Sequence, residues 1–232
     1  MKKHSIVSAL FVVSTFSASA SVIWTGSTSS DVFDDSNWDL TASGVTSVVA
    51  NVSVDDDISV VGGTMELPNL PGQGRFQIGN EFTMTLDNST FSLVAGGNDG
   101  VGGAPMSTGV NVNLINGSQL NTFFIVNAVA LDIDATSSAT FGGGGGPINI
   151  STVNLTDGAI MDFLAETPAA FRAEHLSKIT VDGAPAVEGA NILVESFNGA
   201  SGSRVTVIPV PEPSSVLLGG IAALAVLVRR RK

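Results

Sequence analysis

His175 is the residue of this chain best suited to acid–base chemistry, because an imidazole can exchange a proton near neutral pH. A hydrolase would need a serine nucleophile beside it. Residues 199–203 resemble the Gly-x-Ser-x-Gly pattern that positions such a serine, but their order is out of phase. His175 follows Glu174 in a segment expected to be helical, so we predict a solvated helix residue. With one candidate histidine and no cysteine, the sequence predicts no zinc site.

Carboxylates are the other groups that could bind a metal ion or take part in catalysis. Hard oxygen ligands at close spacing can hold Ca²⁺, but the acidic runs match neither an EF-hand loop nor a glycine-rich calcium repeat. General attraction of cations is therefore expected, with a specific Ca²⁺ site as the alternative. We predict no catalytic residue and no cofactor, although paired acids keep a secreted polysaccharide-acting hydrolase open as an alternative. The acidic runs are Asp31, Asp34, Asp35 and Asp39; Asp55, Asp56 and Asp57; and Asp132 and Asp134.

The charge of the chain is strongly segregated. Six of its 10 basic residues lie at the two ends, and all 21 acidic residues lie between Asp31 and Glu212. That central part holds only four basic residues, which gives it a net charge of −17. Such a body repels nucleic acid, so nucleic-acid binding is excluded as a function.

The first twenty residues have the three parts of a secretory signal peptide. Lys2 and Lys3 form a positive beginning, residues 6–16 are mostly apolar, and Ala18 and Ala20 are the small residues that signal peptidase needs. The apolar run is too short for a stable membrane span. We predict a signal peptide at 1–20 and an exported acidic domain at 21–208.

The C-terminus, residues 209–232, also has three parts. Pro211, Glu212 and Pro213 keep the backbone extended, and an uncharged apolar run follows at 216–228. Four cations end the chain and are expected to stay in the cytoplasm: Arg229, Arg230, Arg231 and Lys232. A run of 13 residues predicts a short transmembrane helix that holds the chain only marginally.

These three ordered elements resemble the PEP-CTERM sorting signal of Gram-negative bacteria. The resemblance implies recognition by an exosortase near Pro211, Glu212 and Pro213, and a host that makes exopolysaccharide or a biofilm matrix. It also implies transient anchoring in the inner membrane, then delivery to the cell envelope, the outer surface or the extracellular matrix. The resemblance identifies an address and leaves the activity of the body open.

Short apolar/polar alternations run through the body and predict an all-β fold. Residues 82–87, 110–114, 131–134 and 148–155 alternate with a period of two, and Asn-Gly or Asp-Gly pairs lie between the runs. A loose pattern begins at Leu86, Leu114, Leu131 and Leu155, with steps of 28, 17 and 24 residues. This spacing favours a right-handed parallel β-helix or β-solenoid, with an antiparallel β-sandwich as the alternative.

Two further features complete the expected body. A threonine cap and Pro168 at the first helical position predict a short helix near 168–177. Trp24 and Trp38 lie in a segment that resembles the opening of exported β-helical and autotransporter-like proteins. They are interpreted as plugs of the open end of the first coil, with a glycan-stacking platform as the alternative.

The sequence thus predicts a non-enzymatic, structural or adhesive protein of the cell surface or matrix. Signal peptidase and exosortase are its expected partners during export, and exopolysaccharide or another matrix component is the expected partner afterwards. A secreted carbohydrate-binding module is the alternative function.

Overall fold

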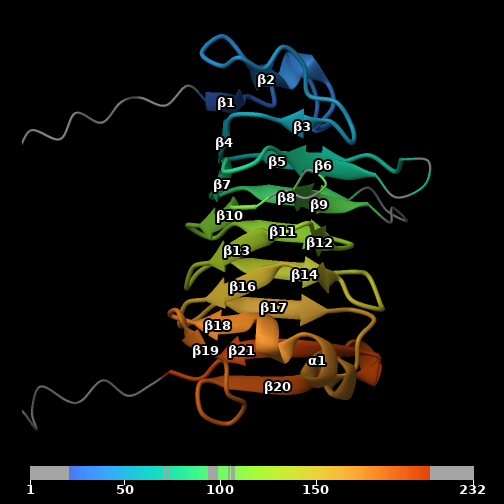
Figure 1. Ribbon diagram of the computed structural model, residues 1–232, viewed down its shortest axis with the longest axis vertical. Coiled ribbons are helices and arrows are strands. Elements are labelled where there is room, and N and C mark those ends of the chain that lie inside the picture. Colours follow the sequence, from blue (N-terminus) through green and yellow to red (C-terminus); the bar gives the residue numbers. More distant parts are fainter. Residues whose placement is uncertain are drawn as a thin grey trace, which may run out of the picture.

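The computed structural model describes residues 21–209, except for 71, 73, 94–98, 104, 106 and 107. The described chain is a β-solenoid of about five coils with one short α-helix near its C-terminal end (Figure 1). Each central coil contributes one strand to each of three sheets, and equivalent strands of successive coils pair in parallel. The prediction of a parallel solenoid is therefore confirmed, and the antiparallel sandwich is wrong.

The first sheet has nine strands and runs the full length of the stack. Its central strands pair in parallel, while β2 and β19 close the two ends in antiparallel pairing. In spatial order the strands are β19 (Ala184–Pro185), β18 (Ile179–Val181), β16 (Thr152–Leu155), β13 (Val129–Ile133), β10 (Val110–Ile115), β7 (Thr83–Asp87), β4 (Asp57–Val61), β1 (Ser21–Trp24) and β2 (Trp38–Asp39).

The second and third sheets form the other two sides of each coil. The second consists of β20 (Ile192–Phe197), β21 (Gly202–Val207), β17 (Ile160–Phe163), β14 (Ser138–Phe141), β11 (Gln119–Thr122), β8 (Thr90–Leu93) and β5 (Thr64–Leu67). The third consists of β15 (Ile148–Asn149), β12 (Ile125–Val126), β9 (Gly100–Gly103), β6 (Arg75–Ile78) and β3 (Ser53–Val54). Three 3-10 turns lie at Asp35–Asn37, Leu176–Lys178 and Asn198–Ala200.

The core fills the interior of the coils. In β10, Val110, Val112 and Leu114 are fully buried, while the intervening asparagines face outward. Because successive side chains of a strand point to opposite faces, this alternation gives each coil one apolar side. The parallel register then places each apolar row on the next, so the buried face is continuous along the stack.

The register also corrects one detail of the predicted repeat. Leu86 pairs with Leu114 as expected, but Leu114 pairs with Ile133, and Ile133 pairs with Leu155. Leu131 lies two residues before Ile133 and faces the same interior, so the sequence pattern indicates it, wrongly, as the residue that corresponds to Leu114. The coils are thus more even in length than the leucines alone indicate.

Both ends of the stack are closed by elements that do not continue the coil. At the N-terminal end this element is β2, which pairs antiparallel with the first stacked strand, β1, with Trp24 opposite Trp38. At the C-terminal end lie helix α1 (Pro168–Glu174) and the antiparallel strands β20 and β21 (Figure 1). The predicted helix is confirmed, with Thr167 as its N-cap.

The segments that carry the predicted targeting signals lie outside the described residues. These are the signal peptide at 1–20 with its cleavage residues, and the motif, apolar helix and basic cluster beyond Pro209. Within the described part of the chain, no helix has the length and apolar character needed to cross a membrane.

Candidate functional site

A group of three ionisable side chains that could bind a metal ion lies at the C-terminal end of the solenoid. Glu166 is in the short connection between β17 and α1, Glu174 is the last residue of α1, and His175 is its C-cap. The helix begins there because Thr167 accepts a hydrogen bond from the N–H of Ala170, with Pro168 at the start. One ligand atom from each of these three residues lies within 4.8 Å of the others.

His175 is fully buried, so the prediction of a solvated helix residue is wrong. Its ring stacks on Phe163 at an interplanar angle of 10° and a centroid distance of 5.4 Å, and it also contacts Phe171. Phe171 is four residues earlier and therefore shares its helix face with His175. That spacing was the available sequence signal, and the charged neighbours Glu174 and Lys178 obscured it.

Glu166 also contacts the buried imidazole, and this residue was not predicted from the sequence. Its Oε1 accepts a hydrogen bond from the N–H of Gly146 at 3.0 Å, and its Oε2 lies 2.8 Å from Nε2 of His175. The direction of the ring N–H does not give this contact hydrogen-bond geometry, and both ring nitrogens lack a hydrogen-bond partner among the described residues. The pair thus lies at ion-pair distance in the core but without hydrogen-bond geometry.

Burial is the main influence on the protonation of His175. Desolvation lowers its pKa, and the positive charge of Lys178 acts in the same direction. The carboxylates of Glu166 and Glu174 oppose this effect without reversing it. The imidazole is therefore neutral at neutral pH, which leaves a ring nitrogen available as an electron-pair donor.

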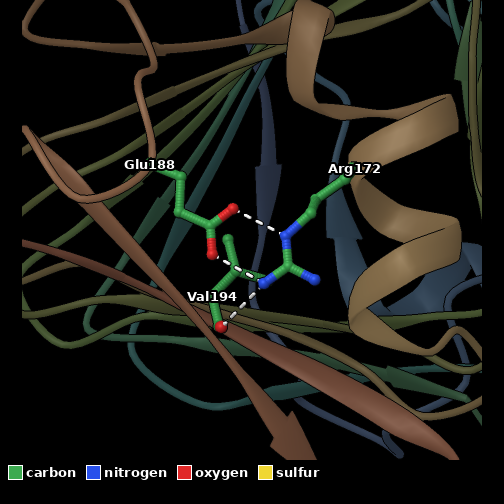
Figure 2. A network of polar contacts seen from close by, with 3 residues as sticks. All are labelled: Arg172, Glu188 and Val194. Carbon is green, nitrogen blue, oxygen red and sulfur yellow. Dashed lines mark hydrogen bonds and ion pairs between the residues drawn. The ribbon is translucent and has the colours of Figure 1, made fainter.

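An ion pair fixes the helix over the end of the stack (Figure 2). Arg172 of α1 donates from Nε and Nη2 to the two carboxylate oxygens of Glu188, each at 2.6 Å, and its Nη2 reaches the carbonyl of Val194 in β20 at 3.5 Å. The hydrogen bond with Arg172 lowers the pKa of Glu188. These contacts join the helix to the loop before β20 and to β20 itself.

A second bidentate pair joins β21 and β17, which are neighbouring strands of the second sheet. Arg204 of β21 donates to both oxygens of Asp162 in β17, with two contacts of 2.7 Å, and its guanidinium lies over the ring of Phe197. Lys178 donates to the carbonyl of Ile148. Three of the four basic residues of the body therefore support the C-terminal cap.

The predicted acidic runs are dispersed over turns. Asp34 and Asp39 each accept hydrogen bonds from a hydroxyl and a backbone N–H two residues ahead, from Ser36 and Thr41, and these bonds lower the pKa of both carboxyls. Such contacts stabilise tight turns. Six of the remaining acids accept a hydrogen bond as well: Asp31 and Asp35 from the N–H of Phe33 and Val48, Asp56 and Asp57 from the N–H of Asp57 and Thr83, Asp132 from the side-chain amide of Asn154, and Asp134 from the N–H of Asn116. Asp55 is exposed.

Trp24 and Trp38 are packed inside the N-terminal end. Their side chains are 5% and 6% exposed, and their rings meet edge to face at a centroid distance of 4.9 Å. Trp38 stacks further on Phe76 and donates from Nε1 to the carbonyl of Val32 at 2.9 Å. Sugar stacking needs an open indole face, so this packing supports the plug and gives no support to a glycan platform.

The outer surface presents two polar features. On the first sheet, Asn154 donates to Asp132 at 3.0 Å and accepts from Thr180 at 2.9 Å, which forms a polar ladder across neighbouring coils. Over the third sheet, a hollow of about 270 Å³ lies between Arg75, two phenylalanines and the glycine loop at 143–146. None of the described residues that line this hollow is acidic, which distinguishes it from the acidic character of the body.

The fold and these surfaces place the chain among the β-solenoid proteins. Residues 209–232 match the family model of the PEP-CTERM protein-sorting motif, so the predicted resemblance is confirmed for this segment. The chain is therefore a solenoid that carries a PEP-CTERM sorting signal. No curated protein and no solved structure matches it. The motif implies export, transient anchoring in the membrane and processing by an exosortase.

Proposed function

We propose that this chain is a non-enzymatic structural protein of the cell surface or extracellular matrix, delivered there through its PEP-CTERM signal. The observation that carries the proposal is the combination of the motif at 209–232 with a solenoid body. A solenoid extends by adding coils and offers long, flat faces for contact with large partners. An exported protein of this shape suits a spacer or a scaffold.

The partner that we propose is a polysaccharide of the matrix. The polar ladder of the first sheet offers hydrogen-bond donors and acceptors, and the hollow beside Arg75 combines a cation with aromatic edges. Such a combination suits a sugar ring that carries a carboxylate. The negative charge elsewhere on the body restricts an anionic chain to this place.

The delivery is tested in the producing bacterium. Cells that express the full chain are compared with cells in which residues 211–213 are replaced by alanine, and the matched control replaces Ser214 and Ser215. Protease treatment of intact cells should remove the wild-type and control proteins from the surface, while the motif variant stays in the membrane fraction. Equal surface exposure of all three proteins would contradict the proposal.

The structural role is tested with the purified full chain and polysaccharide extracted from the matrix. Cosedimentation should show binding that Arg75→Ala weakens and Arg75→Lys retains in part, with no new reducing ends. Cleavage of the polysaccharide would refute a non-enzymatic function. Equal binding of wild type and Arg75→Ala would refute the hollow as the contact.

A further inference from the structure

We propose that Glu166, Glu174 and His175 form a binding site for a divalent transition-metal ion of the Zn²⁺ class at the C-terminal cap. The three residues come from two segments of the chain, and their ligand atoms converge within 4.8 Å. Two of the three side chains are buried, since His175 is 0% and Glu166 is 3% exposed. The inference is independent of the proposed function.

The unsatisfied polar atoms at this place are the observation that points to a ligand. Nε2 of His175 and Oε2 of Glu166 are fully buried, 2.8 Å apart, and not joined by a hydrogen bond of good geometry. Buried polar atoms without partners are rare because they lose their hydration without replacement. A cation between them would satisfy both atoms.

The spacing needs only a small adjustment to receive the ion. Zinc binds nitrogen and carboxylate oxygen at about 2.0–2.2 Å, so two ligands of one tetrahedral ion lie about 3.4 Å apart. Opening the present contact of 2.8 Å by roughly half an ångström meets this value. Glu174 is exposed, and its side chain can turn towards the ion without disturbing the core.

The donor set selects the class of metal. One imidazole nitrogen and two carboxylates suit zinc and its neighbours, whereas Ca²⁺ needs six to eight oxygen ligands. Two carboxylates also balance the charge of a divalent ion. Lys178 is a nearby cation that acts against binding, and its ammonium is held by the carbonyl of Ile148.

The surroundings hold the ligands in place. The N–H of Gly146 donates to the second oxygen of Glu166, which is the type of outer contact that orients metal ligands. Gly146 has a φ of +94°, and a Cβ there would lie 4.0 Å from Oε2 of Glu174. The ion would therefore link the end of α1, the β17–α1 connection and the glycine loop of the preceding coil. Its role would be to fix the cap on the stack.

The sequence predicts no zinc site, because the body holds one histidine and no cysteine. A carboxylate ligand nine residues before a histidine has no recognisable spacing unless the turn that joins them is known. Glu166 and His175 are brought together by the short connection and by the helix that follows it. The fold is thus needed to find the site.

The experiment is a titration of the full chain, purified in mild detergent and stripped of metal by a chelator. Isothermal calorimetry with Zn²⁺ gives the stoichiometry and affinity, and the visible absorption of added Co²⁺ reports a four-coordinate site. The variants are His175→Gln, Glu166→Gln and Glu174→Gln. Glu81→Gln is the matched control, because Glu81 is an exposed glutamate far along the chain from the cluster.

We expect one Zn²⁺ per chain, loss of binding in His175→Gln, at least tenfold weaker binding in Glu174→Gln, and no change in Glu81→Gln. Since Glu174 is exposed, its variant keeps the fold and remains informative even where the buried variants unfold. Absence of stoichiometric binding by wild type would overturn the site. Equal affinity of wild type and Glu174→Gln would overturn it as well, because the metal would then sit on other carboxylates.

Discussion

Replacing Leu114 by alanine tests the stacking of the coils on which the structure depends. Leu114 is fully buried in β10 and lies between Leu86 of the preceding coil and Ile133 of the following one. Its removal leaves a cavity with neighbours on both sides, and buried Leu→Ala changes cost about 2.7–5.0 kcal/mol. We expect a loss of about 3 kcal/mol in the free energy of unfolding.

The matched control is Asn113→Ala, on the adjacent residue of the same strand. Asn113 faces outward between Thr85 and Asp132, so its replacement removes no core volume. We expect a change of less than about 1 kcal/mol. The comparison separates the two faces of one strand under identical conditions.

Urea denaturation of the full chain measures both variants with two signals. Tryptophan fluorescence reports the N-terminal end, where both indoles lie, and far-UV circular dichroism reports all coils. A solenoid coupled through its core should lose both signals at the same lowered midpoint in Leu114→Ala. If Leu114→Ala costs no more than Asn113→Ala, the inner and outer faces are assigned wrongly.

Three further changes probe other parts of the structure. Asn37 is buried, and its side chain takes part in four hydrogen bonds within its loop. Asn37→Ala should therefore lower the free energy of unfolding by about 3 kcal/mol. An unchanged urea midpoint would contradict this role. Gly158 has a φ of +100°, and a Cβ there would lie 2.6 Å from the carbonyl oxygen of Ala135. At Gly183, which also has a positive φ, an added Cβ meets open space. Gly158→Ala should therefore lower the free energy of unfolding by at least about 1 kcal/mol more than Gly183→Ala does, as urea denaturation would show. Burial raises the pKa of Asp134, but hydrogen bonds from hydroxyl and backbone N–H groups outweigh it and keep that pKa below its ordinary value. The stabilisation by the Asp134 carboxylate should therefore be full above about pH 4 and be lost as the pH falls through the pKa of the folded state. The difference in urea midpoint between wild type and Asp134→Asn should then shrink in acid. A difference that does not depend on pH would contradict this.

The strand pattern could be predicted because alternation is a local property. The alternation in β10 predicts that one face is buried, and the structure buries all three residues of that face: Val110, Val112 and Leu114. The choice between a solenoid and a sandwich depends on which strands pair, and alternation says nothing of that. Leu131 shows the difficulty: it faces the core as expected, but the residue in register with Leu114 is Ile133.

The cluster at the C-terminal cap could be predicted only in part. Helix α1 follows from its threonine cap and proline, which act locally. The burial of His175 depends on the helix ending at Glu174 and on its packing against Phe163, which belongs to the neighbouring strand β17. Glu166 contributes through a contact across a turn and through Gly146, twenty residues earlier. Neither contact has a pattern in the sequence.

The central claim is that the solenoid body is exported and then separated from its sorting signal. The body is afterwards either released or attached to another anchor. Mass spectrometry of the protein recovered from the surface of intact cells tests it most directly. The account predicts a chain that begins at Ser21 and lacks the residues after the Pro211–Pro213 motif. Recovery from the cell surface of a polypeptide that still extends from Met1 to Lys232 would contradict it.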